Sequence, residues 1–371
     1  MTHRVGVIGG GQLARMMIPP ALEMGIDLRV LAETDDSSAG LAATAIGDYR
    51  DLATVRAFAA EVDVVTFDHE HVPVEIVEAL EASGVAVHPG SHALTCAQDK
   101  AVMRRRLAEL DIGIPQWSMA TNASDVDAFV AQSASGEVVA KTPRGGYDGK
   151  GVRVISQSSE IAEWLLAGPV LLEEKVGFVT EVAQLIARRP SGQTLAWPLV
   201  ETVQKNGVCS EVLVPGSADP RIVEEAQRMA TRIADGLEVT GVLAVEMFVL
   251  PDGAVLVNEL AMRPHNSGHI FTELSSTSQF EQHLRAVLDW PLGDVSLRAP
   301  SGAMVNIFGG VRHDKISEAL ARDSRVKVHD YGKYARHGRK AGHVSVVGEE
   351  TKDILEVART AVASLALDGL A

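Results

Sequence analysis

The feature that most constrains the fold of this chain is an alternation of short apolar runs with helical patterns over its N-terminal quarter. Apolar runs with strand character cover residues 5–8, 28–32 and 62–67, and a helical pattern covers residues 12–24. Parallel strands need a crossover of a dozen or more residues between them, usually a helix. The alternation therefore predicts an α/β, Rossmann-like N-terminal domain, which we assign to residues 1–97.

The next part of the chain, residues 98–295, changes character. Gly-rich turns separate strand patterns from helical patterns over residues 221–237 and 278–288, and Pro251-Asp252-Gly253 is a hairpin signal. Strands and helices in this arrangement are typical of α+β architecture. We assign these residues to one central domain.

A third, small C-terminal domain is predicted over residues 296–371. Short strand patterns at residues 303–308 and 341–347 precede an amphipathic helical pattern over residues 352–365. Because the chain of 371 residues exceeds the usual size of one domain, a division into three agrees with its length.

The composition excludes several classes of protein. A formal net charge of -15 opposes binding to nucleic acid, because that binding depends mainly on Lys and Arg neutralising phosphates. No run reaches the ~18 apolar residues of a membrane span, and the N-terminus enters a strand pattern without a signal peptide. We therefore expect a cytoplasmic protein that binds neither membrane nor nucleic acid. Cys96 and Cys209 lack metal-site or disulfide spacing, so we expect buried structural residues.

A first glycine loop follows the first predicted strand. Gly9, Gly11 and Ala14 form a G-x-G-x-x-A pattern, and Glu33 stands at the end of the second strand, which is the outline of a dinucleotide fingerprint. Glycines let the backbone approach a ligand closely, and the helix N-terminus that follows favours an anion. The pattern is short, so three interpretations stay open: a nicotinamide site, a substrate site or a tight turn.

A second glycine loop, residues 141–151, connects two apolar strand patterns. Its glycines leave backbone amides able to surround phosphate oxygens, and Lys141, Arg144 and Lys150 would neutralise charge during phosphoryl transfer. It is not a Walker loop, because no G-K-[ST] sequence opens a helix. A flexible hairpin tip is the alternative.

Two carboxylates are predicted to face each other on a hairpin beyond this loop. If Asp252 and Gly253 form a two-residue turn, Pro251 pairs with Ala254. The register that follows places Glu246 opposite Glu259, with ~5 Å between their Cβ atoms. Like charges so placed repel, and hard oxygen ligands suit a Mg²⁺ ion that carries nucleotide phosphates. A slip of one residue would pair Glu246 with Asn258 instead, and a solvated acidic face is the other alternative.

Several distinctive runs follow one another along the chain. They are Gly9-Gly10-Gly11-Gln12-Leu13, Gly145-Gly146-Tyr147-Asp148-Gly149-Lys150-Gly151, Asn258-Glu259, Arg263-Pro264-His265-Asn266-Ser267-Gly268-His269, Ser278-Gln279-Phe280-Glu281 and Gly338-Arg339-Lys340-Ala341-Gly342-His343. Taken together and in this order, they resemble the ATP-dependent 5-(carboxyamino)imidazole ribonucleotide synthase family of bacterial and fungal purine synthesis. The resemblance covers nearly the whole chain, and the combination is far more specific than any single motif. The resemblance implies a Rossmann-like domain, a central ATP-grasp domain whose two lobes clamp ATP, and a small C-terminal domain.

The resemblance also implies site residues at the matching positions. Those for ATP are Lys100, Lys141, Gly146, Tyr147, Asp148, Gly149, Lys150, Gly151, Glu173, Glu174, Lys175, Val176, Glu181, Gln204, Asn258 and Glu259. Within this set, residues 173–176 would line the adenine and Glu181 would hold the ribose. Those for the ribonucleotide are Gln12, Tyr147, Asp148, Arg263 and His265, with Lys333, Arg339 and Lys340 on its phosphate. Mg²⁺ would be held by Glu246 and Glu259, and the catalytic set is Asp148, Arg263 and Lys340, with Asp148 as candidate proton acceptor.

Some positions depart from the family's pattern. Lys100 stands where many relatives have Arg, Gln204 where some have His, and Asp68-His69-Glu70-His71 where an acidic-Phe-Glu-His pattern is common. We expect His69 to be a structural residue.

The activity implied is ATP-dependent carboxylation of 5-aminoimidazole ribonucleotide with bicarbonate, through carboxyphosphate, to give N5-carboxyaminoimidazole ribonucleotide, ADP and phosphate. The resemblance further implies a homodimer whose product passes to the N5-carboxyaminoimidazole ribonucleotide mutase. Another ATP-grasp carboxylate–amine ligase, such as a formate-dependent glycinamide ribonucleotide transformylase, is the nearest alternative. An NAD-dependent oxidoreductase would leave the second glycine loop and the paired carboxylates unexplained. A regulatory protein that binds a nucleotide without turnover is disfavoured by Lys141, Glu246, Glu259 and Arg263 occurring together.

Overall fold

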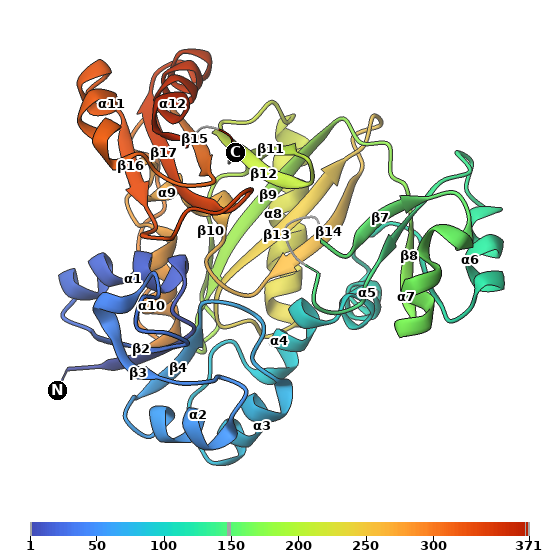
Figure 1. Ribbon diagram of the computed structural model, residues 1–371, viewed down its shortest axis with the longest axis horizontal. Helices are drawn as coiled ribbons and strands as arrows, with labels where there is room; N and C mark the ends of the chain where they lie inside the picture. Colours follow the sequence, from blue (N-terminus) through green and yellow to red (C-terminus); the bar gives the residue numbers. More distant parts are fainter. Residues whose placement is uncertain (1, 147–149, 368, 370–371) are drawn as a thin grey trace.

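The computed structural model describes residues 2–146, 150–367 and 369. These residues form a four-stranded parallel sheet, a nine-stranded sheet and a four-stranded antiparallel sheet. Figure 1 shows the N-terminal sheet (blue) and the C-terminal elements (orange and red) at the left of the view and the small antiparallel sheet at the right, with the central strands of the nine-stranded sheet between them. The mixture of α/β and α+β parts agrees with the fold class predicted from the sequence.

The N-terminal sheet has the strand order β3-β2-β1-β4, and all of its neighbours are parallel. Its elements are β1 (Arg4–Ile8), α1 (Gln12–Glu23), β2 (Asp27–Ala32), η1 (Gly40–Ala42), β3 (Ala43–Ile46), α2 (Leu52–Ala59), β4 (Val64–Phe67), α3 (Val74–Ala82) and α4 (Ser91–Gln98). The three strands and the helix predicted here are confirmed to within two residues. Strand β3 was not predicted, because its four residues do not form an apolar run and two of them are exposed.

The small antiparallel sheet has the order β5-β8-β6-β7. Its elements, with the helix that leads into it, are α5 (Lys100–Glu109), β5 (Trp117–Ala120), α6 (Ala123–Val130), β6 (Val138–Lys141), β7 (Val152–Ile155), η2 (Ser158–Ile161), α7 (Ala162–Ala167) and β8 (Val170–Glu174). The Asp99 carboxylate accepts hydrogen bonds from the amides of Ala101 and Val102 and so caps α5. This cap fixes Lys100 at the first position of the helix.

The large sheet has the order β14-β13-β9-β11-β12-β15-β17-β16, and β10 pairs with β9. Its central part comprises β9 (Thr180–Arg188), β10 (Thr194–Ala196), β11 (Val200–Lys205), β12 (Val208–Val214), α8 (Pro220–Gly236), β13 (Gly241–Val249), β14 (Val255–Ala261), η3 (Asn266–Gly268), α9 (Phe271–Leu274) and α10 (Gln279–Val287). Asp219 caps α8, with Pro220 at its first turn, and Ser278 caps α10, so both predicted helices begin at their sequence signals.

The C-terminal elements extend the same sheet, because β12 pairs with β15. They are β15 (Ser301–Phe308), η4 (His313–Lys315), α11 (Ile316–Arg322), β16 (Lys327–Asp330), β17 (Lys340–Gly348) and α12 (Thr351–Leu365). Helix α12 packs on β15 and β17, which confirms the two strands and the closing helix predicted for this part.

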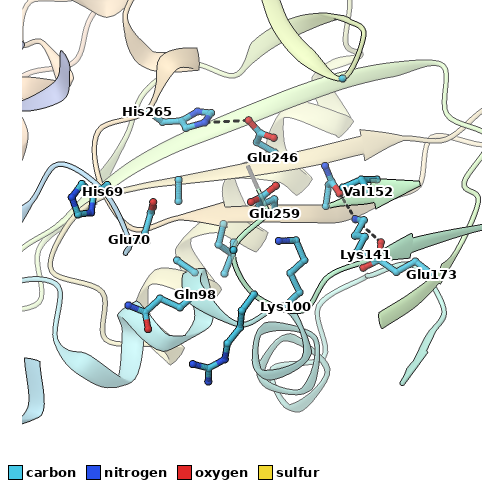
Figure 2. A pocket seen from close by; sticks show the side chains of 18 of the residues that line it. His69, Glu70, Gln98, Lys100, Lys141, Val152, Glu173, Glu246, Glu259 and His265 are labelled. Carbon is cyan, nitrogen blue, oxygen red and sulfur yellow. Dashed lines mark hydrogen bonds and ion pairs between the residues drawn. The ribbon is translucent and has the colours of Figure 1, made fainter. Parts of the chain in front are cut away.

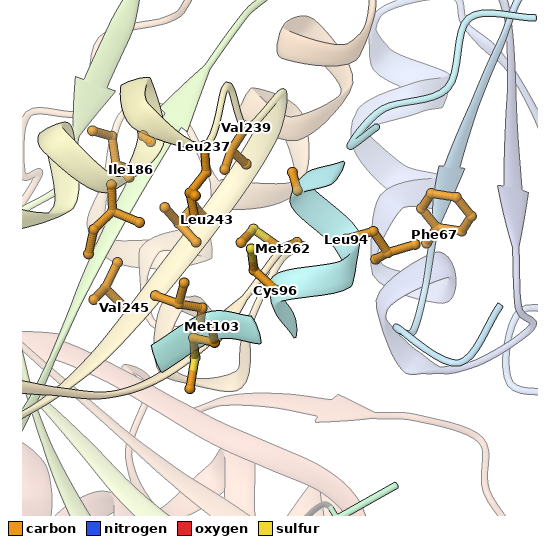
Figure 3. Close-up of a cluster of buried hydrophobic side chains, with 14 of the residues drawn as sticks. Phe67, Leu94, Cys96, Met103, Ile186, Leu237, Val239, Leu243, Val245 and Met262 are labelled. Atoms are coloured by element: carbon orange, nitrogen blue, oxygen red, sulfur yellow. The ribbon is translucent and has the colours of Figure 1, made fainter. Parts of the chain in front are cut away.

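One hydrophobic core crosses from the N-terminal sheet to the large sheet. Figure 3 shows Phe67 of β4 against Leu94 of α4, and Cys96 of the same helix beside Met262 and Leu243. Helix α4 therefore packs on both sheets at once. Both cysteines, Cys96 and Cys209, are buried, as the sequence predicted.

Among the described residues, no helix is long and apolar enough to cross a membrane.

Candidate functional site

A cavity of about 1180 Å³ lies where the three sheets approach one another (Figure 2). The residues assigned to a site from the sequence that line it are Lys100, Lys141, Gly146, Glu173, Glu174, Lys175, Val176, Glu181, Gln204, Glu246, Asn258, Glu259, Arg263, His265 and Lys340. Of the other assigned positions, Tyr147, Asp148 and Gly149 lie outside the described residues. Those that the structure describes but places away from the lining are Gln12, Lys150, Gly151, Lys333 and Arg339.

The β13–β14 hairpin pairs Glu246 with Glu259, which confirms the predicted pair. The register that produces it differs from the predicted one. Leu250 bonds to Ala254 across a three-residue turn, so the strands start one residue out of the expected register, with Met247 opposite Val257. A bulge then leaves Asn258 without an opposite residue and restores the pairing. Both the predicted pair and the alternative slip thus occur, at different points of one hairpin.

The fold changes the pKa of Glu246. Burial, followed by the charge of Glu259, raises the pKa of Glu246 to about 7. The Glu246 side chain is still 24% exposed, toward the cavity. Among the residues the structure describes, no group of three or more His, Cys, Asp or Glu side chains could hold a metal ion. Two opposed carboxylates suit an ion that also binds phosphate, as Mg²⁺ does with nucleotides.

A buried charge network lies beneath the same end of the cavity. Lys141 Nζ is 2.6 Å from Glu173 Oε2 and donates to Asn258 Oδ1 at 3.2 Å. The Arg104 guanidinium, which is fully buried, binds Glu173 Oε1 and donates to the carbonyls of residues 257 and 258. Burial lowers the pKa of Lys141, and Glu173 opposes this shift. Arg104 ties α5, the small sheet and the hairpin together, a role that no sequence motif indicated.

The second glycine loop is a hairpin tip, since β6 and β7 pair antiparallel and Lys141 lies opposite Val152. Gly145 has a positive φ of 76°, which a side chain would strain. A Cβ added at Gly146 would lie 3.5 Å from Lys100 Nζ. The loop backbone and the amine of Lys100 therefore occupy neighbouring space. In Figure 2 the Lys100 side chain points toward Glu259, which places cations and carboxylates around the same volume.

The lining of the cavity also includes two aromatic rings. Phe178 stacks on Phe248 at 4.7 Å between ring centroids, and both rings line the cavity. Burial raises the pKa of Glu181, although a hydrogen bond from Gln204 opposes the shift. A flat apolar wall beside carboxylate and amide groups suits a nucleoside. The two phenylalanines were not identified from the sequence, because they belong to separate strands and no local pattern joins them.

The other half of the cavity contains Arg263, His265 and Lys340. Arg263 Nε is 2.7 Å from Glu70 Oε2, a partner that the sequence did not indicate. His265 Nδ1 accepts the amide hydrogen of Ser267 at 3.3 Å. Burial lowers the pKa of His265 well below its usual value, so the ring is neutral and carries its proton on Nε2, 3.3 Å from Glu246 Oε1. His265 thus connects this half of the cavity, which contains Arg263 and Lys340, to the paired carboxylates.

The first glycine loop packs against the chain's own carboxylate. Asp68 Oδ1 accepts the amide hydrogen of Ala14 at 2.8 Å and so satisfies the N-terminus of α1. A Cβ at Gly11 would lie 2.0 Å from Asp68 Oδ2. This geometry favours the tight-turn interpretation of Gly11 over a nicotinamide site. His69 lies 3.4 Å from Glu33 and lowers the pKa of that carboxyl to about 2; it also lines the cavity.

Gln12 and Lys333 lie together beside the cavity. Lys333 Nζ donates to Gln12 Oε1 at 2.6 Å and to the carbonyl of Lys340 at 3.2 Å. The structure therefore brings Gln12 of the N-terminal part to the loop that precedes β17. Arg339 NH1 is 3.4 Å from the carbonyl of Tyr334 in the same loop.

Three family models match the chain in sequence order. Residues 1–98 match the ribonucleotide synthetase preATP-grasp domain, and residues 105–280 match the ATP-grasp domain. Residues 302–357 match the phosphoribosylaminoimidazole carboxylase C-terminal domain.

Similar proteins and solved structures agree with these family matches. The N5-carboxyaminoimidazole ribonucleotide synthase of Mycobacterium tuberculosis is 45% identical over 371 residues, which cover 96% of this chain and 86% of that protein. The ADP complex of an N5-carboxyaminoimidazole ribonucleotide synthetase superposes with a TM-score of 0.89 at 33% identity, covering 97% of each chain. The Aspergillus clavatus enzyme in complex with ADP and 5-aminoimidazole ribonucleotide gives 0.88 at 29% identity, covering 98% of each chain.

Proposed function

The chain belongs to the N5-carboxyaminoimidazole ribonucleotide synthase family, and from that premise we propose how its residues carry out the reaction. It is an ATP-dependent carbon–nitrogen ligase of purine biosynthesis, which joins bicarbonate to the amine of 5-aminoimidazole ribonucleotide. One observation carries the assignment of roles: a single cavity holds a half suited to a nucleotide and its phosphates and a half lined by Arg263, His265 and Lys340. ATP and the ribonucleotide would meet between the two halves.

ATP would lie in the half that contains the glycine loop. Lys100 and Lys141 would neutralise its phosphates, and Phe178 and Phe248 would form an apolar wall for the adenine. Residues 173–176 and Glu181 keep the adenine and ribose roles implied by the sequence. The buried pair of Lys141 with Glu173 supports a fixed position for this amine, because its partner is itself held by Arg104.

Mg²⁺ would be held by Glu246 and Glu259 together with the phosphates. The two residues fit such an ion, because burial and then the facing charge of Glu259 raise the pKa of Glu246, and a bound cation would stabilise both carboxylates. When bound, the ion would supply charge neutralisation at the ATP phosphates. Asn258, displaced by the bulge, would place its amide beside both the carboxylates and Lys141.

Activation of bicarbonate is needed because the carboxylate is negatively charged and its leaving group is poor. In the proposed step a bicarbonate oxygen bonds to the γ-phosphorus, and the bond to the ADP oxygen breaks. The carbon–oxygen bond to the phosphate group of the resulting carboxyphosphate then breaks, its hydroxyl proton passes to the departing phosphate, and CO₂ forms. The amine nitrogen then bonds to the CO₂ carbon and gives up one proton. The protein contributes positioning and electrostatic stabilisation, and a closed cavity excludes water.

The residues of the substrate half have separate proposed roles. Arg263 would pair with the negatively charged oxygens of bicarbonate and carboxyphosphate, and Glu70 orients its guanidinium through the 2.7 Å ion pair. Neutral His265 would donate from Nε2 toward Glu246 or a substrate oxygen. Lys340, with Lys333 and Arg339 nearby, would hold the ribonucleotide phosphate. Asp148 remains the proposed proton acceptor for the amine.

A phosphate-release assay tests this function. We expect ADP and phosphate to form rapidly only with ATP, Mg²⁺, bicarbonate and 5-aminoimidazole ribonucleotide together. Formate with glycinamide ribonucleotide should not replace the last two, which separates this enzyme from the related transformylase. NAD should have no effect. Substrate-dependent reduction of NAD, or turnover that requires formate, would overturn the assignment.

Family membership alone supports three further proposals. The enzyme would act in the cytoplasm, would form a homodimer, and would pass its product to the mutase that rearranges N5-carboxyaminoimidazole ribonucleotide. Light scattering at working concentration measures the oligomeric state directly.

A further inference from the structure

Three histidine rings stack at the place where the N-terminal, central and C-terminal parts of the chain meet. The rings of His269 and His343 lie 5.0 Å apart between centroids, and those of His343 and His329 lie 4.4 Å apart at an interplanar angle of 9°. His269 and His343 are completely buried. Burial lowers the pKa of each well below its usual value, so both rings are neutral and can stack without repulsion. None of these rings lines the cavity described above.

The stack is part of a row of polar side chains in exact cross-strand register. His343 on β17 lies opposite Asn306 on β15 and opposite His329 on β16. Residues that lie opposite one another on neighbouring strands point to the same face of a sheet. The C-terminal part of the sheet therefore presents one polar row across three strands.

The segment that follows Arg263 meets this row with matching side chains. Asn266 and Asn306 exchange two amide hydrogen bonds, of 3.0 and 2.7 Å. His329 Nε2 lies 2.7 Å from Glu273 Oε1. The stacked His269 occupies the position between these two contacts in sequence. Three side chains of the segment thus each meet one strand: Asn266 meets β15, His269 meets β17 and Glu273 meets β16. These contacts fix the C-terminal part relative to the segment that carries Arg263.

The row also reaches the loop that bears the basic residues. The hydroxyl of Tyr331, which is fully buried, shares a hydrogen bond of 2.7 Å with His343 Nδ1. The backbone carbonyl of Tyr331 accepts a hydrogen bond from Ser38 Oγ of the N-terminal part. Two residues later, Lys333 binds Gln12 and the carbonyl of Lys340. Tyr331 therefore anchors the start of a loop whose far end is Lys340.

We infer that His343 is a positioning residue for the ribonucleotide: through the hydroxyl of Tyr331 it fixes the loop of residues 331–340, and with it the amines of Lys333 and Lys340, against the N-terminal part of the chain. The inference rests on the proposed function, because it takes these two amines to hold the substrate phosphate. ATP binds in the other half of the cavity and should not sense the loop directly. We therefore expect changes at His343 to affect KM for the ribonucleotide and to leave KM for ATP unchanged.

The test separates the hydrogen bond from the stack. Tyr331→Phe and His343→Phe both remove the hydrogen bond and keep a ring, whereas His343→Asn removes the ring and keeps a polar atom at the position of Nδ1. We expect the two Phe variants to raise KM for 5-aminoimidazole ribonucleotide about 3- to 10-fold with KM for ATP unchanged, the scale of one lost hydrogen bond. His343→Asn should stay within about 2-fold of the unmodified enzyme in both constants, even if its Tm is lower. His92→Phe on α4, a partly exposed histidine remote from the loop, serves as control.

Each outcome decides the question. Equal changes in both KM values, or a His343→Asn variant as impaired as His343→Phe, would show that the stack merely stabilises the fold. Unchanged KM values in all three variants would show that the loop does not depend on His343. Failure of the proposed function is distinguishable from both, since the unmodified enzyme would then show no turnover dependent on the ribonucleotide.

Discussion

Glu246 is a carboxyl group whose pKa differs between the folded and the unfolded chain. Its pKa is raised to about 7 because it is desolvated and faces Glu259. A carboxyl whose pKa is higher in the folded than in the unfolded chain binds more protons when folded. The free energy of unfolding therefore falls as pH rises from about 4.5 to about 7. Above that range the ionised Glu246 destabilises the folded protein to its full extent.

Replacing Glu246 by Gln should therefore separate stability from activity. We expect Glu246→Gln to abolish phosphoryl transfer, because the substitution removes an anionic ligand for the ion that carries the ATP phosphates. The metal-free variant should be more stable than the unmodified protein at pH 8, by about 1 kcal/mol once partial exposure is taken into account, and the gain should vanish near pH 5. Calorimetric melting at both pH values, beside turnover at saturating Mg²⁺, measures both effects.

The exposed Glu78→Gln on α3 is the matched control for this prediction, and it should change neither quantity. Glu259→Gln should behave like Glu246→Gln, since either change leaves one carboxylate. A variant that melts well below the unmodified protein yet keeps substantial turnover would show that the paired glutamates are structural.

Lys340 is the basic residue of the proposed phosphate site that lines the cavity itself. We expect Lys340→Ala to raise KM for the ribonucleotide about 10- to 100-fold and to leave KM for ATP nearly unchanged, because a charge-assisted hydrogen bond contributes ~1.5–3 kcal/mol. Lys352→Ala, an exposed lysine on α12, is the control. Steady-state kinetics with each substrate varied in turn gives both constants. A rise confined to KM for ATP would contradict the assignment.

At the scale of elements, the β13–β14 hairpin shows what a sequence pattern can determine. The Asp252-Gly253 signal located the turn correctly, because glycine at φ 86° is what such a turn needs. It did not determine the loop length, and the turn has three residues. Glu246 still faces Glu259, because the bulge at Asn258 compensates for the longer turn. A bulge depends on the neighbouring strand and leaves no local signature, so the pair was predicted correctly through a register that is wrong near the turn.

The glycine loops show the same limit in a different way. The first loop follows the dinucleotide pattern, yet the group that approaches Gly11 most closely is Asp68, which is 57 residues away in sequence. The pattern left a ligand site and a tight turn open, and only the tertiary structure could identify the group that approaches Gly11 as part of the chain. Arg104 and Glu70 escaped the sequence analysis for a related reason. Each acts through a partner, Glu173 or Arg263, that lies far along the chain.

At the scale of the whole molecule, the parts of the chain are joined by continuous structure. The large sheet passes from the central part into the C-terminal part through the β12–β15 pair, and one hydrophobic core spans the N-terminal and central parts. Sequence patterns separated these regions because each has its own periodicity. The boundaries at residues 97 and 295 remain predictions, since the packing between parts depends on side chains that no local pattern joins.

His283 on α10 is one such joining residue, and its protonation state gives a test of the contact. Its Nδ1 accepts the amide hydrogen of Val242 at 3.0 Å, and its Nε2 lies 2.8 Å from Thr66 Oγ1 of the N-terminal sheet. The ring is fully buried, and burial lowers its pKa to about 3. Since Nδ1 accepts, the neutral ring has its proton on Nε2 and donates to the threonine. The hydrogen bond from the Val242 amide therefore requires the neutral imidazole.

The pH dependence follows from the difference between the two states of the protein. Below pH 6.5 the unfolded chain protonates His283 while the folded chain does not until about pH 3, so the stabilising contribution is complete above pH 6.5 and is lost as pH falls. The slope for one group is at most ~1.4 kcal/mol per pH unit. His283→Gln should be less stable than the unmodified protein at pH 7.5, because it loses the two imidazole hydrogen bonds. Since glutamine does not titrate, this difference in stability should shrink by about 2 kcal/mol at pH 5. Urea unfolding at both pH values measures the difference, with the exposed His337→Gln as control. A difference independent of pH would mean that His283 takes up its proton as readily in the folded protein as in the unfolded chain, and would contradict the lowered pKa.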